Sequence, residues 1–262
     1  MMIFLIFIFG LAIGSFLNVL IVRLPQPEIS KYRNIVGGHS RCPKCRKRIF
    51  WFENIPVLSF FILKGRCRNC GSKISWQYPL VELLTGFLFL VSFLMYGNSL
   101  VYLIYVLFLV GLLTAIAFID LNNLLIPDSL ILVGFIVSFV FIFFASHFSP
   151  TISNFYGLLF FGGILLFLFL MTKGRGIGLG DVKMAGWLGF AFGLENSISL
   201  FYLTFFIGFI VAIILLVSKK AGLKSKVPLG SIMALASVLF LLSGFNLLDF
   251  INSELILRLW LD

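Results

Sequence analysis

Charged residues are scarce in this 262-residue chain. Only 11% of its residues are charged, 61% are hydrophobic, 33 are Phe, and the mean hydropathy is +1.12. A water-exposed globular surface of this size cannot be built from such a composition. The sequence also lacks the polar and apolar alternation of a membrane barrel, and it offers apolar stretches near the ~20 residues that cross ~30 Å of hydrocarbon as a helix. We therefore predict an all-α polytopic membrane protein.

About eight transmembrane helices are expected. The candidate spans are residues 2–22, 79–97, 99–119, 129–147, 153–172, 182–195, 196–218 and 228–245, of which the sixth is short and poorly bounded. The first span has no basic residue before its apolar part and no small-residue cleavage site, so we expect a retained helix rather than a signal peptide. Residues 247–262 are too polar to span and are expected to form an interfacial tail.

Basic residues predict the orientation of these spans. Twelve of the twenty Lys and Arg lie between Arg23 and Tyr78, and seven more cluster in 173–183 and 219–226. Threading eight spans places these nineteen on one side, with Arg258 as the exception, and the positive-inside rule makes that side cytoplasmic. The net charge of +10 is thus explained by membrane orientation, and we expect no nucleic-acid partner.

The four cysteines predict a small cytoplasmic domain over residues 23–78. They form two C-x2-C pairs, Cys42 with Cys45 and Cys67 with Cys70. Such pairs let four thiolates reach one tetrahedral zinc ion, which then has no open position for catalysis and is structural. Disulfides are disfavoured in a reducing compartment, whereas an iron–sulfur cluster is an alternative that the spacing leaves open.

Three aromatic residues flank the cysteine pairs. Trp51, Phe52 and Trp76 are expected to form the core of this small domain, and a platform for a planar ligand is the alternative. His39 could substitute as a metal ligand, but we interpret it as a solvated loop histidine.

Carboxylates are even rarer, with ten in the whole chain. Six are expected to be solvated surface groups: Glu28, Glu53, Glu195, Asp249, Glu254 and Asp262. Glu82, one turn into the second span, is expected to snorkel or to pair with the basic loop. Asp128, just after Pro127, is interpreted as a structural acid favoured by the helix dipole.

Asp120 and Asp181 are the two functional candidates. Each lies at the end of an uncharged run, and the predicted topology places both at the same cytoplasmic depth, where ionisable groups are rare and commonly functional. Two close carboxylates cannot both ionise, so one can hold a proton while the other activates water. The glycines at 174, 176, 178 and 180 are expected to let a substrate backbone approach Asp181. A serine mechanism is disfavoured, because Ser15 and Ser231 have no candidate histidine base.

The motifs that carry these residues occur in a specific order. They are "GLAIGSFLNVLIVRLP", "RCPKC", "WFENIPVLSF", "LKGRCRNC", "ISWQYPLVELLTG", "IDLNNLLIPD", "GLGDVKM" and "VPLGSIMALAS". Through most of its length the chain resembles bacterial type IV prepilin peptidases, which are intramembrane aspartyl proteases of the GxGD class. It departs modestly from the family's "PFGP"-like segment, which reads "VPLGS" and lacks the second proline.

The resemblance implies a function. Asp120 and Asp181 become the catalytic pair, which removes the leader of prepilin or pseudopilin substrates after a glycine, at the cytoplasmic face of the bacterial inner membrane. Many members also methylate the new amino terminus with S-adenosylmethionine, an activity linked to the cysteine-bearing segment and to the position of Gly65. Residue 65 can equally be a turn glycine. The implied layout is a first helix over 1–22, the cysteine domain over 23–78, a peptidase core over 79–246 and the tail.

Two alternatives remain at this point. A peptidase without methyltransferase activity leaves the carboxylate pair unchanged. An ion-coupled transporter or channel predicts charged groups near the midplane and inverted repeats, whereas these acids lie at one interface. Lys183 is interpreted mainly as a membrane anchor, although it could bias which carboxylate loses its proton.

Overall fold

The computed structural model describes residues 1–26, 40–145, 152–218 and 227–243. These residues form helices and two isolated antiparallel bridges, with no strand among them. They belong to two compact units, Met1–Ala115 and Ile116–Asp262. The predicted all-α class is confirmed, and the predicted tail at 247–262 and His39 lie outside the described residues.

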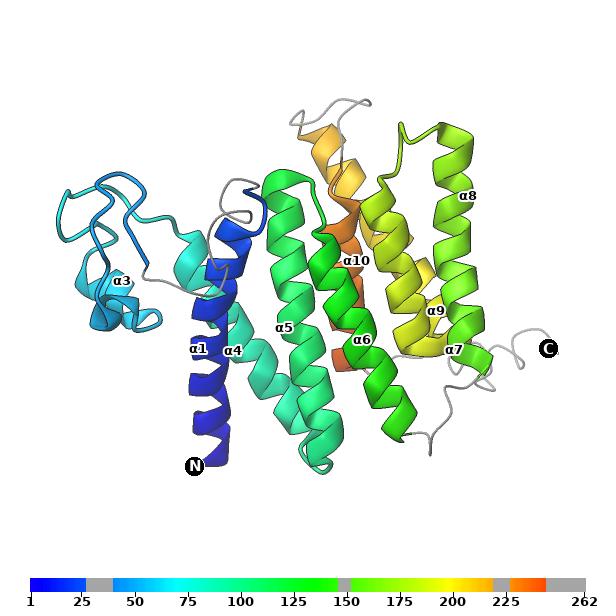
Figure 1. The fold of residues 1–262 in the computed structure, drawn as a ribbon, viewed down its shortest axis with the longest axis horizontal. Helices are drawn as coiled ribbons and strands as arrows, with labels where there is room; N and C mark the ends of the chain where they lie inside the picture. Colours follow the sequence, from blue (N-terminus) through cyan, green and yellow to red (C-terminus); the bar gives the residue numbers. More distant parts are fainter. Residues whose placement is uncertain (27–39, 146–151, 219–226, 244–262) are drawn as a thin grey trace. The chain divides into compact units, whose positions relative to one another are not determined.

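In the Met1–Ala115 unit, α1 (Met2–Arg23) packs tightly along α4 (Gln77–Tyr96), as Figure 1 shows. The approach is close because Gly10 and Gly14 lie in the contact. A Cβ atom added to Gly10 would lie 2.7 Å from the Cα atom of Gly86. Small residues in such contacts let helix backbones meet, which favours helix packing in a membrane.

The chain between α1 and α4 forms the cysteine-bearing part of this unit. It contains the short helix η1 (Trp51–Asn54) and the five-residue helix α3 (Leu58–Ile62). One bridge pairs Arg41 with Arg48 and the other pairs Arg66 with Lys73, so each C-x2-C pair sits in its own small hairpin. α5 (Leu100–Asn123) then begins in this unit and ends in the next.

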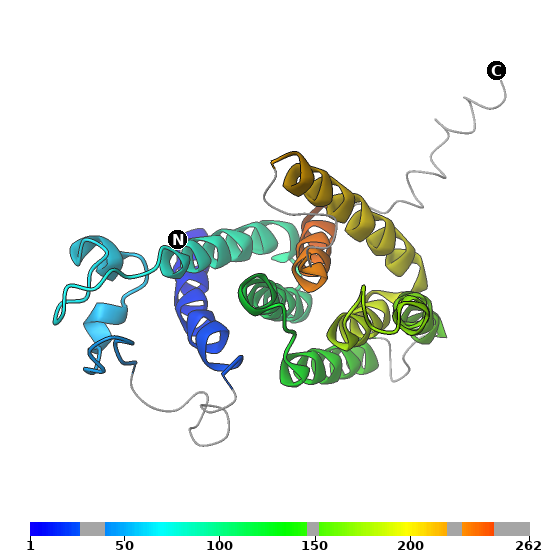
Figure 2. The ribbon, with the colours of Figure 1, turned by 90° about the horizontal axis from the view of Figure 1, so that it is seen from above.

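The Ile116–Asp262 unit is built around α9 (Leu179–Val217), with which five other elements pack. These are α6 (Asp128–Ala145), α7 (Ile152–Gly157), the π-helix η2 (Leu158–Gly162), α8 (Gly163–Thr172) and α10 (Leu229–Ser243). Figure 2 shows these helices from above. Buried polar contacts fix their register: Asn154 Nδ2 donates to the Phe190 carbonyl at 2.8 Å, and Trp187 Nε1 donates to Ser138 Oγ at 3.1 Å.

Five helical segments are long and apolar enough to cross a membrane, and α6 and α10 are shorter apolar helices. The predicted spans 182–195 and 196–218 both fall within α9. At ~1.5 Å per residue a straight helix of its 39 residues would be nearly twice the ~30 Å hydrocarbon thickness. The helix is broken at Gly193, whose φ of 75° and ψ of 171° lie outside the helical region. This break allows two membrane crossings in one continuous stretch.

Candidate carboxylate and metal sites

Asp120 lies near the end of α5 and is 4% exposed. Its Oδ2 atom accepts a hydrogen bond from the backbone N–H of Ser231 at 2.7 Å, and the Ser231 hydroxyl lies 2.9 Å from the same oxygen. That hydroxyl also lies 2.9 Å from the Ala117 carbonyl, and its single proton can serve only one acceptor at a time. Asp120 is therefore held in place by a residue of α10 that lies 111 positions later in the sequence.

Asp181 lies in the first turn of α9, where the helix begins after Gly178. Its Oδ2 atom accepts a hydrogen bond from the Gly178 N–H at 3.0 Å. A carboxylate at this position satisfies one of the unpaired donors at a helix start and interacts favourably with the helix dipole. The "GLGD" segment thus fixes the orientation of the Asp181 side chain.

The two predicted acids come together within the Ile116–Asp262 unit. They are close enough to repel each other electrostatically, and the backbone N–H of Gly230 faces both carboxyl groups. Ile126 completes the junction, because Cβ atoms added to Gly180 and Gly230 would meet its side chain at 3.3 and 2.5 Å. Residues near the starts of α6, α9 and α10 thereby meet beside Asp120.

The contacts at Gly180 and Lys183 differ from our expectations. Gly180 packs against Ile126, so this glycine serves a close helix contact as well as any approach of a substrate. Lys183 Nζ lies 2.8 Å from both carboxylate oxygens of Asp128. The lysine therefore ties the start of α6 to the first turn of α9, and Asp128 is a structural acid as predicted.

Ser231 and Gly230 are site residues that the sequence reasoning missed. Ser231 was considered only as a nucleophile, and the "VPLGS" segment only for its helix geometry. The available signal was its departure from the family pattern: a proline at 231 could not donate a backbone hydrogen bond, whereas serine supplies both an N–H and a hydroxyl. A Cβ on Gly230 would lie 3.0 Å from Asp120 Oδ2, so only glycine fits there without displacement.

The four cysteines also come together, in the Met1–Ala115 unit. All four are free thiols, and their Sγ atoms lie within 4.8 Å of one another. The Sγ atoms of Cys42 and Cys70 are 3.8 Å apart, which matches the separation of about 3.8 Å that follows from tetrahedral Zn–S bonds of ~2.3 Å. The donor set and its geometry fit a four-thiolate metal ion.

Local hydrogen bonds prepare some of these thiols for a cation. Backbone N–H groups, first that of Cys45, and the Ser72 hydroxyl lower the pKa of the Cys42 thiol to about 6. Although the Lys47 N–H favours the thiolate of Cys45, burial and the neighbouring thiols raise its pKa to about 11. Four thiolates cannot coexist at this distance without a compensating cation, which is the role a bound metal ion fills.

Two glutamates of this unit do not behave as surface groups. Glu53 was expected to be solvated, but its side chain is only 6% exposed, and its Oε2 atom caps η1 by accepting the Phe50 N–H at 2.9 Å. Glu82 was expected to snorkel or to pair with the basic loop. It is buried, so it does not snorkel, and it contacts that loop by accepting the backbone N–H of Val57 at 2.7 Å, which ties the cysteine-bearing part to α4.

Gly65 lies in a left-handed turn with φ of +64°, before the second cysteine pair. A Cβ atom there would lie 3.2 Å from the ring of Phe60, which itself packs against Trp76 at 4.7 Å between ring centroids. Trp51, Trp76 and Phe52 are 80%, 67% and 40% exposed, so the expectation that these three aromatic residues form a core is wrong. The order of this region comes from the hairpins and the thiol cluster rather than from a tryptophan core.

Comparison with known proteins shows which family the chain resembles. The family model described as "Bacterial Peptidase A24 N-terminal domain" matches residues 8–96, and "Type IV leader peptidase family" matches 107–215. The proteins named prepilin leader peptidase/N-methyltransferase from Bacillus subtilis (strain 168) and Aeromonas salmonicida (strain A449) are 34% and 33% identical to it. The matches cover 95% and 92% of this chain and 97% and 90% of those proteins. The protein of that name from Myxococcus xanthus (strain DK1622) is 46% identical over 49% of this chain and 37% of its own length. No solved structure matches the chain.

The helical membrane fold and these matches define the class: an aspartic peptidase built into a multi-pass membrane protein. The chain belongs to the type IV leader peptidase family, which confirms the resemblance that its motifs carry.

Proposed function

We propose that this protein is a membrane-embedded endopeptidase that cleaves the leader of prepilin and pseudopilin substrates after a glycine, and that Asp120 and Asp181 are its catalytic residues. The observation that carries the proposal is the meeting of these two carboxyl groups beside the Gly230 N–H, each at a helix end and each hydrogen-bonded from the backbone. The enzyme is placed in the bacterial inner membrane, with the site and the cysteine domain facing the cytoplasm.

The chemistry follows from a shared proton. One carboxylate removes a proton from a water molecule while the water oxygen bonds to the scissile carbonyl carbon, and the protonated partner donates its proton to the carbonyl oxygen. The C–N bond then breaks as the carboxyl group that took the water's proton donates it to the leaving nitrogen, while a hydroxyl of the intermediate returns its proton to the other carboxylate. The Ser231 N–H to Asp120 and the Gly178 N–H to Asp181 hold the two carboxyl groups in place, so little reorganisation is needed during the reaction.

We further propose that the same chain methylates the amino terminus that cleavage exposes. The support is the name of its relatives and the intact cysteine-bearing segment. S-adenosylmethionine supplies the methyl group when bound. Cys42, Cys45, Cys67 and Cys70 hold a structural zinc ion, and in the implied layout residues 23–78 serve methyl transfer while residues 79–246 form the peptidase core. Gly65 contributes through its turn and its contact with Phe60.

The test is incubation of the purified protein with a synthetic prepilin. Cleavage is measured by mass spectrometry for the wild type and for the Asp120→Asn and Asp181→Asn variants, and we expect each substitution to reduce the rate by at least about 10²-fold. Asp128→Asn is the matched control, because it removes a nearby acid that pairs with Lys183 rather than with the site. Full cleavage by either site variant would show that Asp120 and Asp181 are not the catalytic pair.

Methyl transfer is tested in the same samples. A mass increase of one methyl group on the cleaved product with S-adenosylmethionine present supports the bifunctional enzyme, and an unmodified product favours the peptidase alone. A transporter, the less favoured alternative, predicts no cleavage at all.

A further inference from the structure

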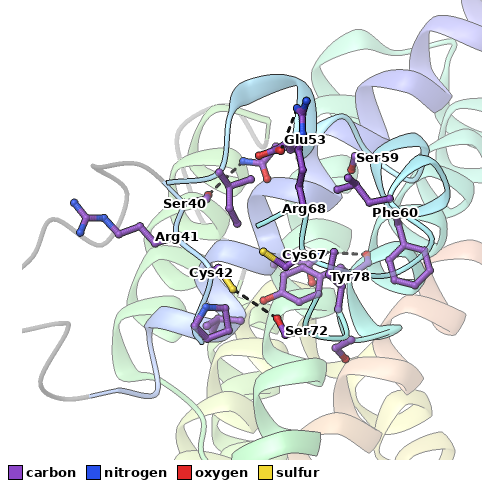
Figure 3. A pocket seen from close by; sticks show the side chains of 18 of the residues that line it. Ser40, Arg41, Cys42, Glu53, Ser59, Phe60, Cys67, Arg68, Ser72 and Tyr78 are labelled. Carbon is purple, nitrogen blue, oxygen red and sulfur yellow. Dashed lines mark hydrogen bonds and ion pairs between the residues drawn. The ribbon is translucent and has the colours of Figure 1, made fainter. Parts of the chain in front are cut away.

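A cavity of about 430 Å³ lies in the Met1–Ala115 unit, between the end of α1 and the cysteine-bearing part. Figure 3 shows its walls. Asn18 and Arg23 of α1 form one side, Cys42 and Cys67 another, and Tyr78 belongs to the start of α4. This volume is in the range of small-molecule sites, which are about 300–1,000 Å³.

Two buried acceptors in this cavity lack hydrogen bonds. Asn18 is 2% exposed and donates from Nδ2 to the Tyr78 carbonyl at 3.1 Å, but its Oδ1 atom has no partner among the described residues. Glu53 uses Oε2 to cap η1, while its Oε1 atom is buried and accepts no hydrogen bond there. The nearest cation is Arg68, with Nη1 3.7 Å from Oε1 (Figure 3). Folded proteins rarely leave such atoms unsatisfied, because a buried acceptor without a hydrogen bond loses the hydration it had in the unfolded chain.

The remaining walls indicate what kind of ligand satisfies these atoms. Phe60 and Tyr78 contribute aromatic rings, and Phe60 is held between Gly65 and Trp76. Several basic side chains also line the cavity: Arg23, Arg41, Lys44, Lys47, Arg68 and Lys73. A fitting ligand therefore carries hydrogen-bond donors, an apolar planar part and an anionic group.

We infer that this cavity binds S-adenosylmethionine, with Asn18 Oδ1 and Glu53 Oε1 as acceptors for its donor groups. The inference rests on the proposed methyl transfer and locates it. The molecule offers hydroxyl, amine and ammonium donors for the two acceptors, an adenine ring for the aromatic wall and a carboxylate for the basic side chains, and its sulfonium cation needs a lining acid such as Glu53 to offset those basic side chains. Asn18 and Glu53 are binding residues in this account, and the thiol cluster forms one wall of the cavity.

The first experiment measures binding without turnover. Isothermal titration of the full-length, zinc-loaded protein with S-adenosylhomocysteine, the product form of the donor, is expected to show one site. Glu53→Gln and Asn18→Ala each remove one acceptor and are expected to weaken binding by at least about 10-fold. Glu195→Gln and Asn98→Ala, at exposed positions, are the matched controls and are expected to bind as the wild type does. Adenosine and methionine, titrated separately, show which half of the molecule supplies the affinity.

Leader cleavage and zinc content report whether each variant is folded. Wild-type affinity in both acceptor variants would overturn the inference while leaving methyl transfer intact. A wild type that neither binds the nucleoside nor methylates a cleaved product would overturn methyl transfer itself.

Photolabelling keeps the inference testable if a variant fails to fold. An azido-adenosyl analogue of the donor is crosslinked to the wild-type protein, and the labelled peptides are identified by mass spectrometry. We expect labels in the segments that contain Asn18 or Phe60. Labels confined to segments that do not line the cavity would overturn the proposed location, as would labelling that unlabelled S-adenosylhomocysteine does not compete away.

Discussion

In the Ile116–Asp262 unit, Asp120 and Asp181 lie beside each other and each accepts a backbone hydrogen bond, whereas in the Met1–Ala115 unit the Glu53 side chain is buried and one of its oxygen atoms accepts no hydrogen bond among the described residues. The first arrangement positions two carboxyl groups for sharing a proton. The second keeps a single acceptor ready for a ligand. All three residues are acids, so it is the neighbouring groups rather than the residue type that decide whether a buried carboxyl group suits proton transfer or ligand binding.

The largest effect is expected from loss of the metal ion, which should abolish methyl transfer but leave leader cleavage intact. Replacing Cys67 by Ser removes one of four ligands, and structural zinc contributes an apparent ~10–16 kcal/mol in small zinc domains. We expect zinc content to fall from one ion per chain towards none and methyl transfer to be lost, while leader cleavage is retained. Ser72→Ala is the control: it removes a hydroxyl 3.2 Å from Cys70 Sγ but keeps all four thiols, so the metal should stay. Equal loss of cleavage and methylation in Cys67→Ser would show that the two regions do not act separately.

Ser231→Ala should test the positioning of Asp120 from α10. A hydrogen bond to a charged group contributes about 1.5–3 kcal/mol, so we expect a decrease in kcat for leader cleavage of about 10-fold or more, with KM unchanged. Ser231→Thr keeps the hydroxyl and should restore most of the rate. The matched control is Ser237→Ala on the same helix, whose hydroxyl donates only to the Met233 carbonyl. An equal effect of both alanine variants would indicate a general loss of α10 stability instead.

The sequence predicted those features that depend on composition and local pattern. The spans predicted from hydropathy overlap the observed helices. The spacing of the cysteines was enough to predict that Cys42 and Cys70 share a cluster. The charge distribution predicted a common depth for Asp120 and Asp181, although a position at a helix end does not by itself predict that they meet. Periodicity could not separate the two crossings within α9, because the break at Gly193 depends on a single backbone conformation.

Long-range partners were beyond sequence reasoning. Glu53 resembles any other acid of a basic loop, but its side chain caps η1 and lines a cavity together with residues that are distant in sequence, such as Asn18 on α1. Ser231 is one serine among many until the fold places its N–H at Asp120. Such contacts depend on tertiary packing, which no local pattern records.

Gly65→Ala should test whether the Phe60 ring forms part of the binding cavity in the first unit. Alanine at a φ of +64° costs about 1 kcal/mol, and its Cβ would press on the Phe60 ring at 3.2 Å. We expect binding of S-adenosylhomocysteine to weaken by about 3- to 10-fold, because this ring is part of the cavity wall. Gly71→Ala is a close control: its φ is +68°, but nothing lies within 4 Å of the added Cβ. If both variants bind equally well, the contact with Phe60 does not contribute to the site.

The smallest effect is expected at the ion pair of Lys183 and Asp128. Both side chains are largely exposed, and exposed pairs contribute less than about 1 kcal/mol. Lys183→Met and Asp128→Asn should therefore each lower the rate of cleavage only about 2- to 3-fold, and the double variant should be no worse than either single one, as measured by a double-mutant cycle. High salt should reduce the coupling further. A large loss of cleavage rate in Lys183→Met with none in Asp128→Asn would mean that the lysine acts directly on Asp181, which lies two positions earlier in α9. The carboxyl groups of the second unit would then depend on a nearby positive charge as well as on backbone donors.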